Sequence, residues 1–269
     1  MYAIDLHTHT RFFHGFDALG RRFDPFGARL LARTARARGL DGIVTTNHDF
    51  YREFADVEGI ELIPGIEVTT TRGHVLIVGP DPPADVEPGA LTPRETVERA
   101  RERDCAAIIA HPYRNSTVRT VDVDFAAVEI NGKGTESYEW VRRLARERDL
   151  PLVAGSDAHY PVEVGRAFTV LGEVPGEDDA DDAEDADDAE NVVDTARARD
   201  ATPAEELTPE YVVSAIRDGR VRAYVDRRPS QRLLRTAYAV THGLKGWIDR
   251  PEWEAPGLGT PPGEQRNRP

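Results

Sequence analysis

The chain has 269 residues, of which 39% are hydrophobic, so it is long enough for one barrel-sized domain with a substantial core. It contains no run of eighteen apolar residues and no basic or apolar leader, which predicts neither a membrane span nor a secretory signal. The single cysteine, Cys105, excludes an internal disulfide and favours a reducing, cytoplasmic location.

The formal charge of −14 is concentrated in one segment. Residues 177–190 contribute ten acidic and no basic side chains, which leaves −4 for the rest of the chain. Because the rest of the chain is also slightly negative, non-specific binding along nucleic acid is disfavoured. A local basic pocket could still hold the phosphate of a small substrate or a short oligonucleotide. The sequence does not predict the oligomeric state.

Short apolar runs alternate with amphipathic segments through residue 172. This alternation is typical of βα units around a mostly parallel sheet, and it predicts an α/β fold whose main part spans residues 1–172. Strands are predicted at 2–6, 42–46, 60–66, 75–79, 105–110, 125–130, 151–155 and 167–171. Helices are predicted at 25–38, 92–103 and 137–148.

The remaining segments differ in composition. Residues 173–205 are acidic, rich in alanine and without apolar periodicity, so we expect a disordered insertion. Residues 206–240 are assigned to the end of the domain, and 241–269 to a loose tail that is rich in proline and glycine. Further helices are predicted at 208–217 and 230–244.

Metal binding is first indicated by DLHTHT, residues 5–10. Side chains alternate along a strand, so His7 and His9 project to the same side and suit a divalent transition metal. Such a pair alone is a weak signal, but other ligand-type residues follow predicted strands. Because the ends of barrel strands carry active sites, these residues are predicted to share one centre. They are His14, His48, Glu67, His74, His111, Asp157 and His159.

Nine candidate ligands exceed the needs of one ion. A carboxylate such as Glu67 can bridge two ions, so a centre of two or three ions is expected. Nitrogen-rich ligands with a few carboxylates favour zinc, iron or manganese over magnesium or calcium. His242 lies outside this pattern and receives no role.

An ordered set of motifs along the chain resembles the PHP (polymerase and histidinol phosphatase) family. These motifs are DLHTHT with a following HG, TTNHD, GIE, GH before VLIVG, AHP, VEINGK and GSDAH. The resemblance implies a distorted (β/α)7 TIM-like barrel, with three metal ions at the C-terminal mouth of its strands. Carried over by position, it implies the same nine ligands. Two departures are His14, where many members have Asp, and Asn47, which replaces the Asp of a TDH motif. The acidic insertion also lies outside the family pattern.

The chemistry implied is hydrolysis of a phosphate ester of a small metabolite or nucleotide by attack of metal-bound hydroxide. We assign Asp157 and His48 to catalysis, with Asp157 either a plain ligand or also a proton shuttle. Arg114 is the first candidate for binding the substrate phosphate, and Lys133 is the second. Arg52 and Arg72 are further candidates.

Three alternatives stay open at this point. A TatD-type or amidohydrolase-like hydrolase or nuclease also begins with H-x-H on a barrel strand, but it would need fewer ligands. A non-catalytic PHP-like scaffold or ribonucleoprotein subunit would be expected to lose ligands. For Glu129, within VEIN, a structural role in the barrel's inner layer is favoured over orientation of a ligand.

Overall fold

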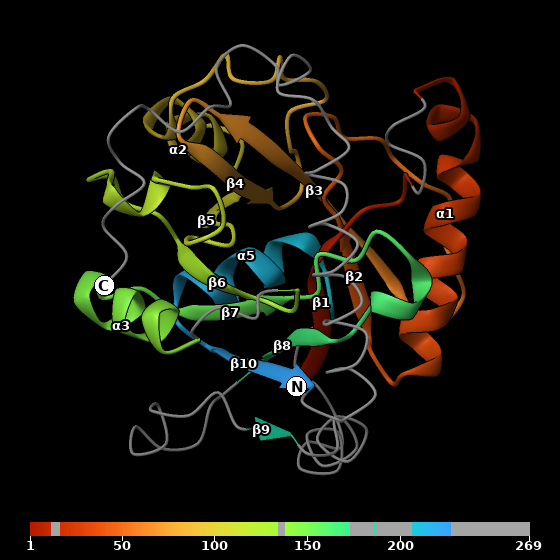
Figure 1. The fold of residues 1–269 in the computed structure, drawn as a ribbon. Helices are drawn as coiled ribbons and strands as arrows, with labels where there is room; N and C mark the ends of the chain where they lie inside the picture. Colours follow the sequence, from red (N-terminus) through yellow and green to blue (C-terminus); the bar gives the residue numbers. More distant parts are fainter. Residues whose placement is uncertain (12–16, 134–137, 173–184, 187–205, 227–269) are drawn as a thin grey trace, which may run out of the picture.

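The computed structural model describes residues 1–11, 17–133, 138–172, 185–186 and 206–226. These residues form a single curved sheet with helices around it (Figure 1). The strands are β1 (Tyr2–Thr8), β2 (Gly42–Thr45), β3 (Glu61–Thr70), β4 (Gly73–Val78), β5 (Ala106–Ile109), β6 (Ala127–Asn131), β7 (Leu152–Gly155), β8 (Ala167–Leu171), β9 (Asp185–Ala186) and β10 (Val221–Asp226). The helices are α1 (Asp17–Ala37), α2 (Pro93–Arg101), α3 (Tyr138–Arg148) and α5 (Pro209–Arg217), with short 3₁₀ turns at Val118–Thr120 and Pro161–Glu163.

The strands lie in the order β7-β6-β5-β4-β3-β2-β1-β8-β10-β9. The pairs β1–β2, β2–β3, β5–β6 and β6–β7 are parallel, whereas β4 is antiparallel to both of its neighbours, and so is β8. Strands β1, β2, β3, β5, β6 and β7 therefore point the same way, and their C-terminal ends lie at one mouth. The sheet is nearly closed, which confirms the distorted TIM-like barrel, although its strand pairing is more mixed than predicted.

Backbone hydrogen bonds between β1 and the segment after β7 close the barrel. The amide of His9 donates to the carbonyl of Ala158 over 2.7 Å, and the amide of Ala158 donates to the carbonyl of His7 over 3.2 Å. These bonds join the first strand to the strand at the far end of the sheet order. Residues about 150 positions apart in the sequence are thereby placed side by side at the mouth.

The side chains that point into the barrel are polar near the C-terminal mouth and apolar farther from it. Ile63, Ala127 and Val153 belong to a buried cluster that α5 covers from one end with Val212 and Ile216. Because alternate residues share a face, the same faces of β3, β6 and the chain after β7 continue upward to acidic side chains. The apolar layer thus forms a floor beneath a polar layer. Figure 1 shows α1 beside β2, α2 beside β4 and α3 beside β6 and β7.

Local sequence signals account for several boundaries. Thr92 caps α2 by accepting from the amide of Glu95, whose carboxylate accepts from the amide of Thr92 in return, and Pro93 takes the first helical position. Gly39 follows α1 with φ of 83°, a conformation that glycine adopts without steric cost. Strands β3 and β4 form a hairpin, with Thr70 paired to Gly73.

Two features of the structure differ from the prediction. Helix α1 begins at Asp17 and passes through Pro25, whereas the predicted helix, based on apolar spacing, begins at this proline. Strand β10 was not predicted. Its partner β9, Asp185–Ala186, lies inside the acidic insertion and pairs with β10 in parallel. Several predicted segments lie outside the described residues. They are the rest of that insertion, the predicted helix at 230–244, residues 227–240 of the predicted end of the domain, and the tail at 241–269. Among the described residues, none of the helices combines the length and the apolar character needed to cross a bilayer.

Candidate metal centre

Glu67 is the hub of a buried cluster of imidazoles at the mouth of the barrel. It lies near the end of β3, and both of its carboxylate oxygens face histidines from other elements. His7, His9 and His48 approach one oxygen, Oε2, with ring nitrogens at 3.1, 3.3 and 3.1 Å. His74 and His111 approach the other oxygen, Oε1, at 3.1 and 2.9 Å. One carboxylate therefore lies between two sets of nitrogen ligands.

Asp157 forms a second hub, just after β7. Its Oδ1 lies 3.2 Å from His9 Nε2, 3.3 Å from His159 Nδ1 and 3.7 Å from His7 Nε2. Its Oδ2 instead accepts from Arg114 Nη2 at 2.5 Å. The two oxygens thus have different partners, because Oδ1 faces the imidazoles and Oδ2 faces the guanidinium.

Three overlapping groups in this cluster have the compactness of a metal site. Within each group, one ligand atom per residue lies within 4.8 Å of the others. The groups are His7, His9 and Asp157; His48, Glu67 and His74; and His9, His48 and His159. Since His9 and His48 each belong to two groups, neighbouring ions would share ligands.

The cluster is buried on one side and open on the other. The side chains of His7, Glu67 and Asp157 are 0%, 1% and 2% exposed, whereas those of His48 and His74 are 39% and 27% exposed. A ligand from solvent therefore reaches the cluster past His48 and His74.

The two carboxyl groups are held ionised. Burial alone would raise the pKa of Glu67, but His48, His7 and His74 outweigh it and hold the pKa well below its usual value. The pKa of Asp157 is likewise held well below normal, because Lys133, Arg114 and His7 overcome the effect of burial. Both residues are anions at neutral pH.

The imidazoles divide into two classes. Burial, with His9 and His74 alongside, lowers the pKa of His48 to about 3 despite the opposing effect of Glu67. Burial, together with His9 and Lys133, lowers the pKa of His159 well below normal. The pKa of His7 is instead raised well above normal, because Glu129, Glu67 and Asp157 outweigh its burial. Neutral imidazoles such as His48 and His159 are the form that binds a metal.

An incompletely satisfied nitrogen supports a metal in this cluster. Among the described residues, Nε2 of His9 is buried and makes no hydrogen bond of good geometry, although two carboxylates lie within 3.3 Å. A buried polar atom of this kind is costly unless another group satisfies it. The imidazole and carboxylate donors fit zinc, iron or manganese, so the residues present fit the expected ions.

Eight of the nine predicted ligands are brought together, since each of them contacts Glu67 or Asp157 or is one of these two residues. His14 lies outside the described residues. Two ligand positions, His111 and Asp157, have φ of 25° and 54°, which non-glycine residues rarely adopt and which functional sites often hold.

The two first phosphate-binding candidates occupy different places. Arg114 contacts Asp157 and its side chain is 40% exposed, so it borders the open side of the cluster. Lys133 is 1% exposed, and its Nζ lies 2.6 Å from His159 Nδ1 and 3.6 Å from Asp157 Oδ1. Arg72 instead donates to Thr117 and Thr120, away from the cluster.

Sequence reasoning missed some of the residues that support the cluster. Asp5 is fully buried and accepts from the amides of Ser156 and Gly165, each at 2.8 Å. Asn47, one of the family departures, accepts from the amide of Thr10 at 2.9 Å and so fixes the chain after β1. A polar residue inside an otherwise apolar strand was the available signal for Asp5.

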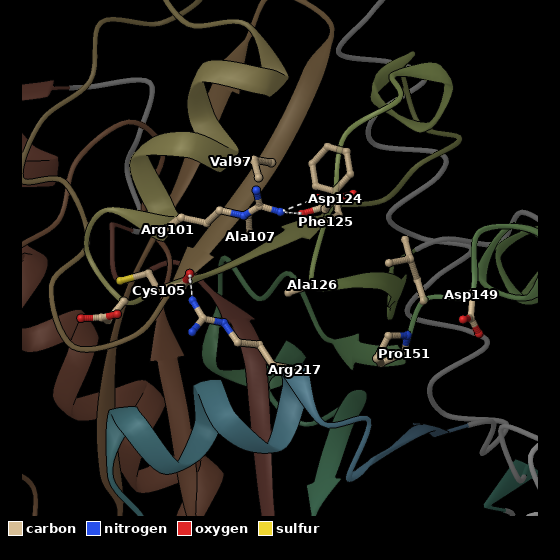
Figure 2. A pocket seen from close by; sticks show the side chains of 12 residues that line it. Val97, Arg101, Cys105, Ala107, Asp124, Phe125, Ala126, Asp149, Pro151 and Arg217 are labelled. Carbon is tan, nitrogen blue, oxygen red and sulfur yellow. Dashed lines mark hydrogen bonds and ion pairs between the residues drawn. The ribbon is translucent and has the colours of Figure 1, made fainter.

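A cavity of about 540 Å³ lies at the other end of the strands. Cys105, Ala126 and Pro151 line it, and each directly precedes a strand, β5, β6 or β7. Figure 2 shows Arg101 of α2 paired with Asp124, and Arg217 of α5 directed at the backbone of Cys105. This cavity contains none of the clustered histidines.

Comparison with known proteins agrees with this architecture. The sequence profile of the PHP-associated family matches residues 138–200. An uncharacterized protein of Methanocaldococcus jannaschii is 29% identical over 139 residues, 47% of this chain and 79% of that protein. Ribonuclease P protein component 3 of Natronomonas pharaonis is 27% identical over 175 residues, 55% of this chain and 73% of that protein.

Two solved structures share the fold. PsfC from Pseudomonas syringae has a TM-score of 0.60 at 17% identity, over 90% of this chain and 98% of that one. A two-domain protein of Bacteroides vulgatus, which contains a predicted PHP-like metal-dependent phosphoesterase, has a TM-score of 0.53 at 16% identity. That match covers 84% of this chain and 65% of the other.

The fold and the cluster define a barrel protein with side chains of the metal-binding type clustered at the mouth of the barrel. With the ordered motifs and the profile that matches residues 138–200, the chain is similar to the PHP family.

Proposed function

We propose that the protein is a metal-dependent phosphoesterase that hydrolyses a phosphate ester of a small metabolite or nucleotide. The observation that carries this proposal is the position of Glu67, whose two oxygens separate His7, His9 and His48 from His74 and His111. A carboxylate in this position is suited to bridge two ions. The proposal includes all nine predicted ligands, and zinc, manganese or iron as the ions.

Bound ions would supply an activated water and would neutralise charge on the phosphoryl oxygens. The protein's own contribution is to place the substrate on the open side, which His48 and His74 border. The buried side excludes water from His7 and Asp157 and so strengthens their interaction with a cation.

Arg114 is the proposed phosphate-binding group. Its guanidinium lies beside the cluster, it is partly exposed, and one of its nitrogens already contacts Asp157. A guanidinium has further donors in the same plane, so it can hold Asp157 and a phosphate oxygen together. Lys133 is buried against His159 and Asp157. We propose that it assists binding of the substrate phosphate by placing positive charge beside these two residues.

The low pKa of Asp157 supports the role of ligand over that of proton shuttle. A carboxylate that remains ionised well below its usual range is a poor proton acceptor at neutral pH, so its role as ligand is favoured. His48, with a pKa of about 3, is neutral and carries no proton to donate from the imidazolium form. We propose that it acts as a ligand that faces the substrate.

The similarity to Ribonuclease P protein component 3 keeps a ribonucleoprotein subunit as a second candidate. The buried cluster argues against a scaffold without catalysis. Burying ionised carboxylates among imidazoles is unfavourable unless cations or hydrogen bonds compensate, and a scaffold has no need of this arrangement.

The test is to strip the purified protein of metal and to restore zinc, manganese or iron separately. The esters p-nitrophenyl phosphate and bis-p-nitrophenyl phosphate then report monoesterase and diesterase activity. We expect hydrolysis that depends on added metal and that Asp157→Ala abolishes. Absence of hydrolysis with every metal, together with tight RNA binding in a gel-shift assay, would support the ribonucleoprotein candidate instead.

A further inference from the structure

Glu129 is a fully buried acid on β6 that is not among the nine predicted ligands. Its two oxygens contact two different ligand residues. Oε1 lies 2.8 Å from Nδ1 of His7, and Oε2 accepts from the backbone amide of His111 at 2.9 Å. Asn131, two residues along the same strand, also donates to Oε2, over 3.3 Å.

The contact with His7 determines which ring nitrogen keeps its proton when the neutral imidazole binds a metal. The oxygen of a carboxylate accepts hydrogen bonds, so the 2.8 Å contact favours the tautomer in which Nδ1 carries the proton and donates to Glu129. The other nitrogen, Nε2, then points at Glu67 and Asp157, which lie at 3.1 and 3.7 Å. His7 is thereby directed to bind a cation through Nε2.

The contact with His111 stabilises an unusual backbone. His111 has φ of 25°, which costs conformational energy in a residue with a side chain. The bond from its amide to Glu129 fixes this conformation. The ring of His111 then directs Nε2 at Glu67 Oε1 over 2.9 Å.

A glycine makes room for the pair formed by Glu129 and His7. Gly155 ends β7, which pairs with β6 and leads to the residues that close the barrel against β1. A Cβ at this glycine would lie 2.5 Å from His7 Cβ and 2.8 Å from Glu129 Oε1. These separations are far shorter than van der Waals contact, so any side chain at residue 155 would force the pair apart.

We propose that Glu129 is the positioning residue of the centre, which aligns His7 through its ring and His111 through its backbone on opposite oxygens of Glu67. This inference rests on the proposed metal centre. A carboxylate that accepts from a ligating histidine fixes its orientation and increases its basicity, and loss of such a partner typically lowers metal affinity by 10–100-fold. Glu129 contacts two of the ligands, so its effect would extend to both sides of Glu67.

The test compares zinc affinity, by competition with a chelating dye, in the wild-type protein and in Glu129→Gln. The amide of glutamine has one oxygen, so it can accept from either His7 or His111, and its NH₂ group then faces a donor. We expect zinc affinity to fall by 10–100-fold. The matched control is Glu139→Gln on α3, where the acid is 74% exposed and pairs with Arg142, and zinc affinity should not change.

Three outcomes are separable. Weaker zinc binding by Glu129→Gln, with Glu139→Gln unchanged, supports the inference. Equal zinc affinity in Glu129→Gln and wild type overturns it and leaves the metal centre standing. Failure of the wild-type protein to bind zinc at all overturns the proposed function, and the inference with it.

A measurement on the wild-type protein applies even if Glu129→Gln does not fold. Nitrogen-15 NMR of the histidine rings in the zinc-loaded protein distinguishes the protonated nitrogen from the metal-bound one, with the His7 signals assigned by their loss in His7→Gln. We expect His7 to carry its proton on Nδ1 and zinc on Nε2. Zinc on Nδ1 would contradict the role of Glu129.

Discussion

The two ends of the barrel place charged side chains in opposite ways. At the C-terminal mouth, Glu67 and Asp157 are almost fully buried and each contacts at least three histidines. At the other end, Arg101 pairs with Asp124 beside the cavity, and these side chains are 53% and 87% exposed. The same scaffold thus supports a desolvated, mutually dependent cluster at one end and solvent-exposed pairs at the other.

This difference shows where the fold includes charged groups whose burial costs free energy. Exposed ion pairs contribute little to stability, so loss of the pair between Arg101 and Asp124 should cost little. Buried acids, by contrast, cost free energy that only specific partners offset, and positive φ at His111 and Asp157 adds further strain. Buried charge collected at one end of the barrel is typical of a functional site.

The largest expected effect at the mouth is from Glu67→Gln. The amide keeps the shape of the hub but removes its charge and one of its two acceptor oxygens. Because metal ions contribute several kcal/mol to catalysis, we expect metal-dependent hydrolysis to fall by roughly 10³-fold or more. Steady-state kinetics at saturating metal measures this loss. Activity within a factor of about ten of wild type would contradict the central role of Glu67.

A second effect concerns Asp5, which supports the mouth from below. Burial raises its pKa to about 6, against the opposing hydrogen bonds from Ser156, Gly165 and His7. Since the folded pKa lies above the unfolded one, the folded state binds more protons between about pH 4 and 6. The contribution of Asp5 to stability therefore falls as the pH rises through this window, by about 3 kcal/mol in all.

Asp5→Asn removes this titration. We expect the difference in unfolding free energy between wild type and Asp5→Asn to decrease from pH 4 to 6 and to be level above pH 7, in urea titrations of the metal-free proteins. Asp81→Asn, at a 68% exposed acid that pairs with Arg103, is the matched control and should give no such trend. Parallel stability curves for wild type and Asp5→Asn would contradict the raised pKa.

Arg114→Ala should have an intermediate effect on catalysis. A charged hydrogen bond to a phosphate is worth about 1.5–3 kcal/mol, so we expect kcat/KM to fall by about 10–100-fold. Unchanged kinetics would show that another group binds the phosphate.

Arg101→Ala at the opposite end should have the smallest effect. Its exposed pair with Asp124 contributes at most about 1 kcal/mol, and the cavity beside it is remote from the cluster. We expect an unchanged kcat/KM, which makes this variant the control for Arg114→Ala. A loss of activity equal to that of Arg114→Ala would mean that the two ends are coupled.

Much of the mouth could be predicted from the sequence because its ligands follow strands that apolar runs identify. His7, His48, Glu67 and Asp157 are examples, and parallel strands in a barrel bring their ends to one mouth. Glu129 was predicted to have a structural role in the inner layer of the barrel, because the sequence around an acid in an apolar strand does not indicate its partners. Those partners depend on barrel closure and on the space left by Gly155.

Other parts could not be predicted for different reasons. Strand β10 pairs with β8, and its register arises from tertiary contacts rather than from a local pattern. The role of α5 as a floor beneath the cluster also depends on contacts with several strands. The cavity of Figure 2 is formed where loops meet before β5, β6 and β7, and no motif in these loops indicates it.

The most direct test of the proposed metal centre is the metal content of the protein after dialysis against zinc, manganese or iron, measured by elemental analysis for wild type and Glu67→Gln. We expect two or three tightly held ions per wild-type chain and the loss of at least one in Glu67→Gln. Fewer than one ion per wild-type chain with every metal would contradict the proposed centre.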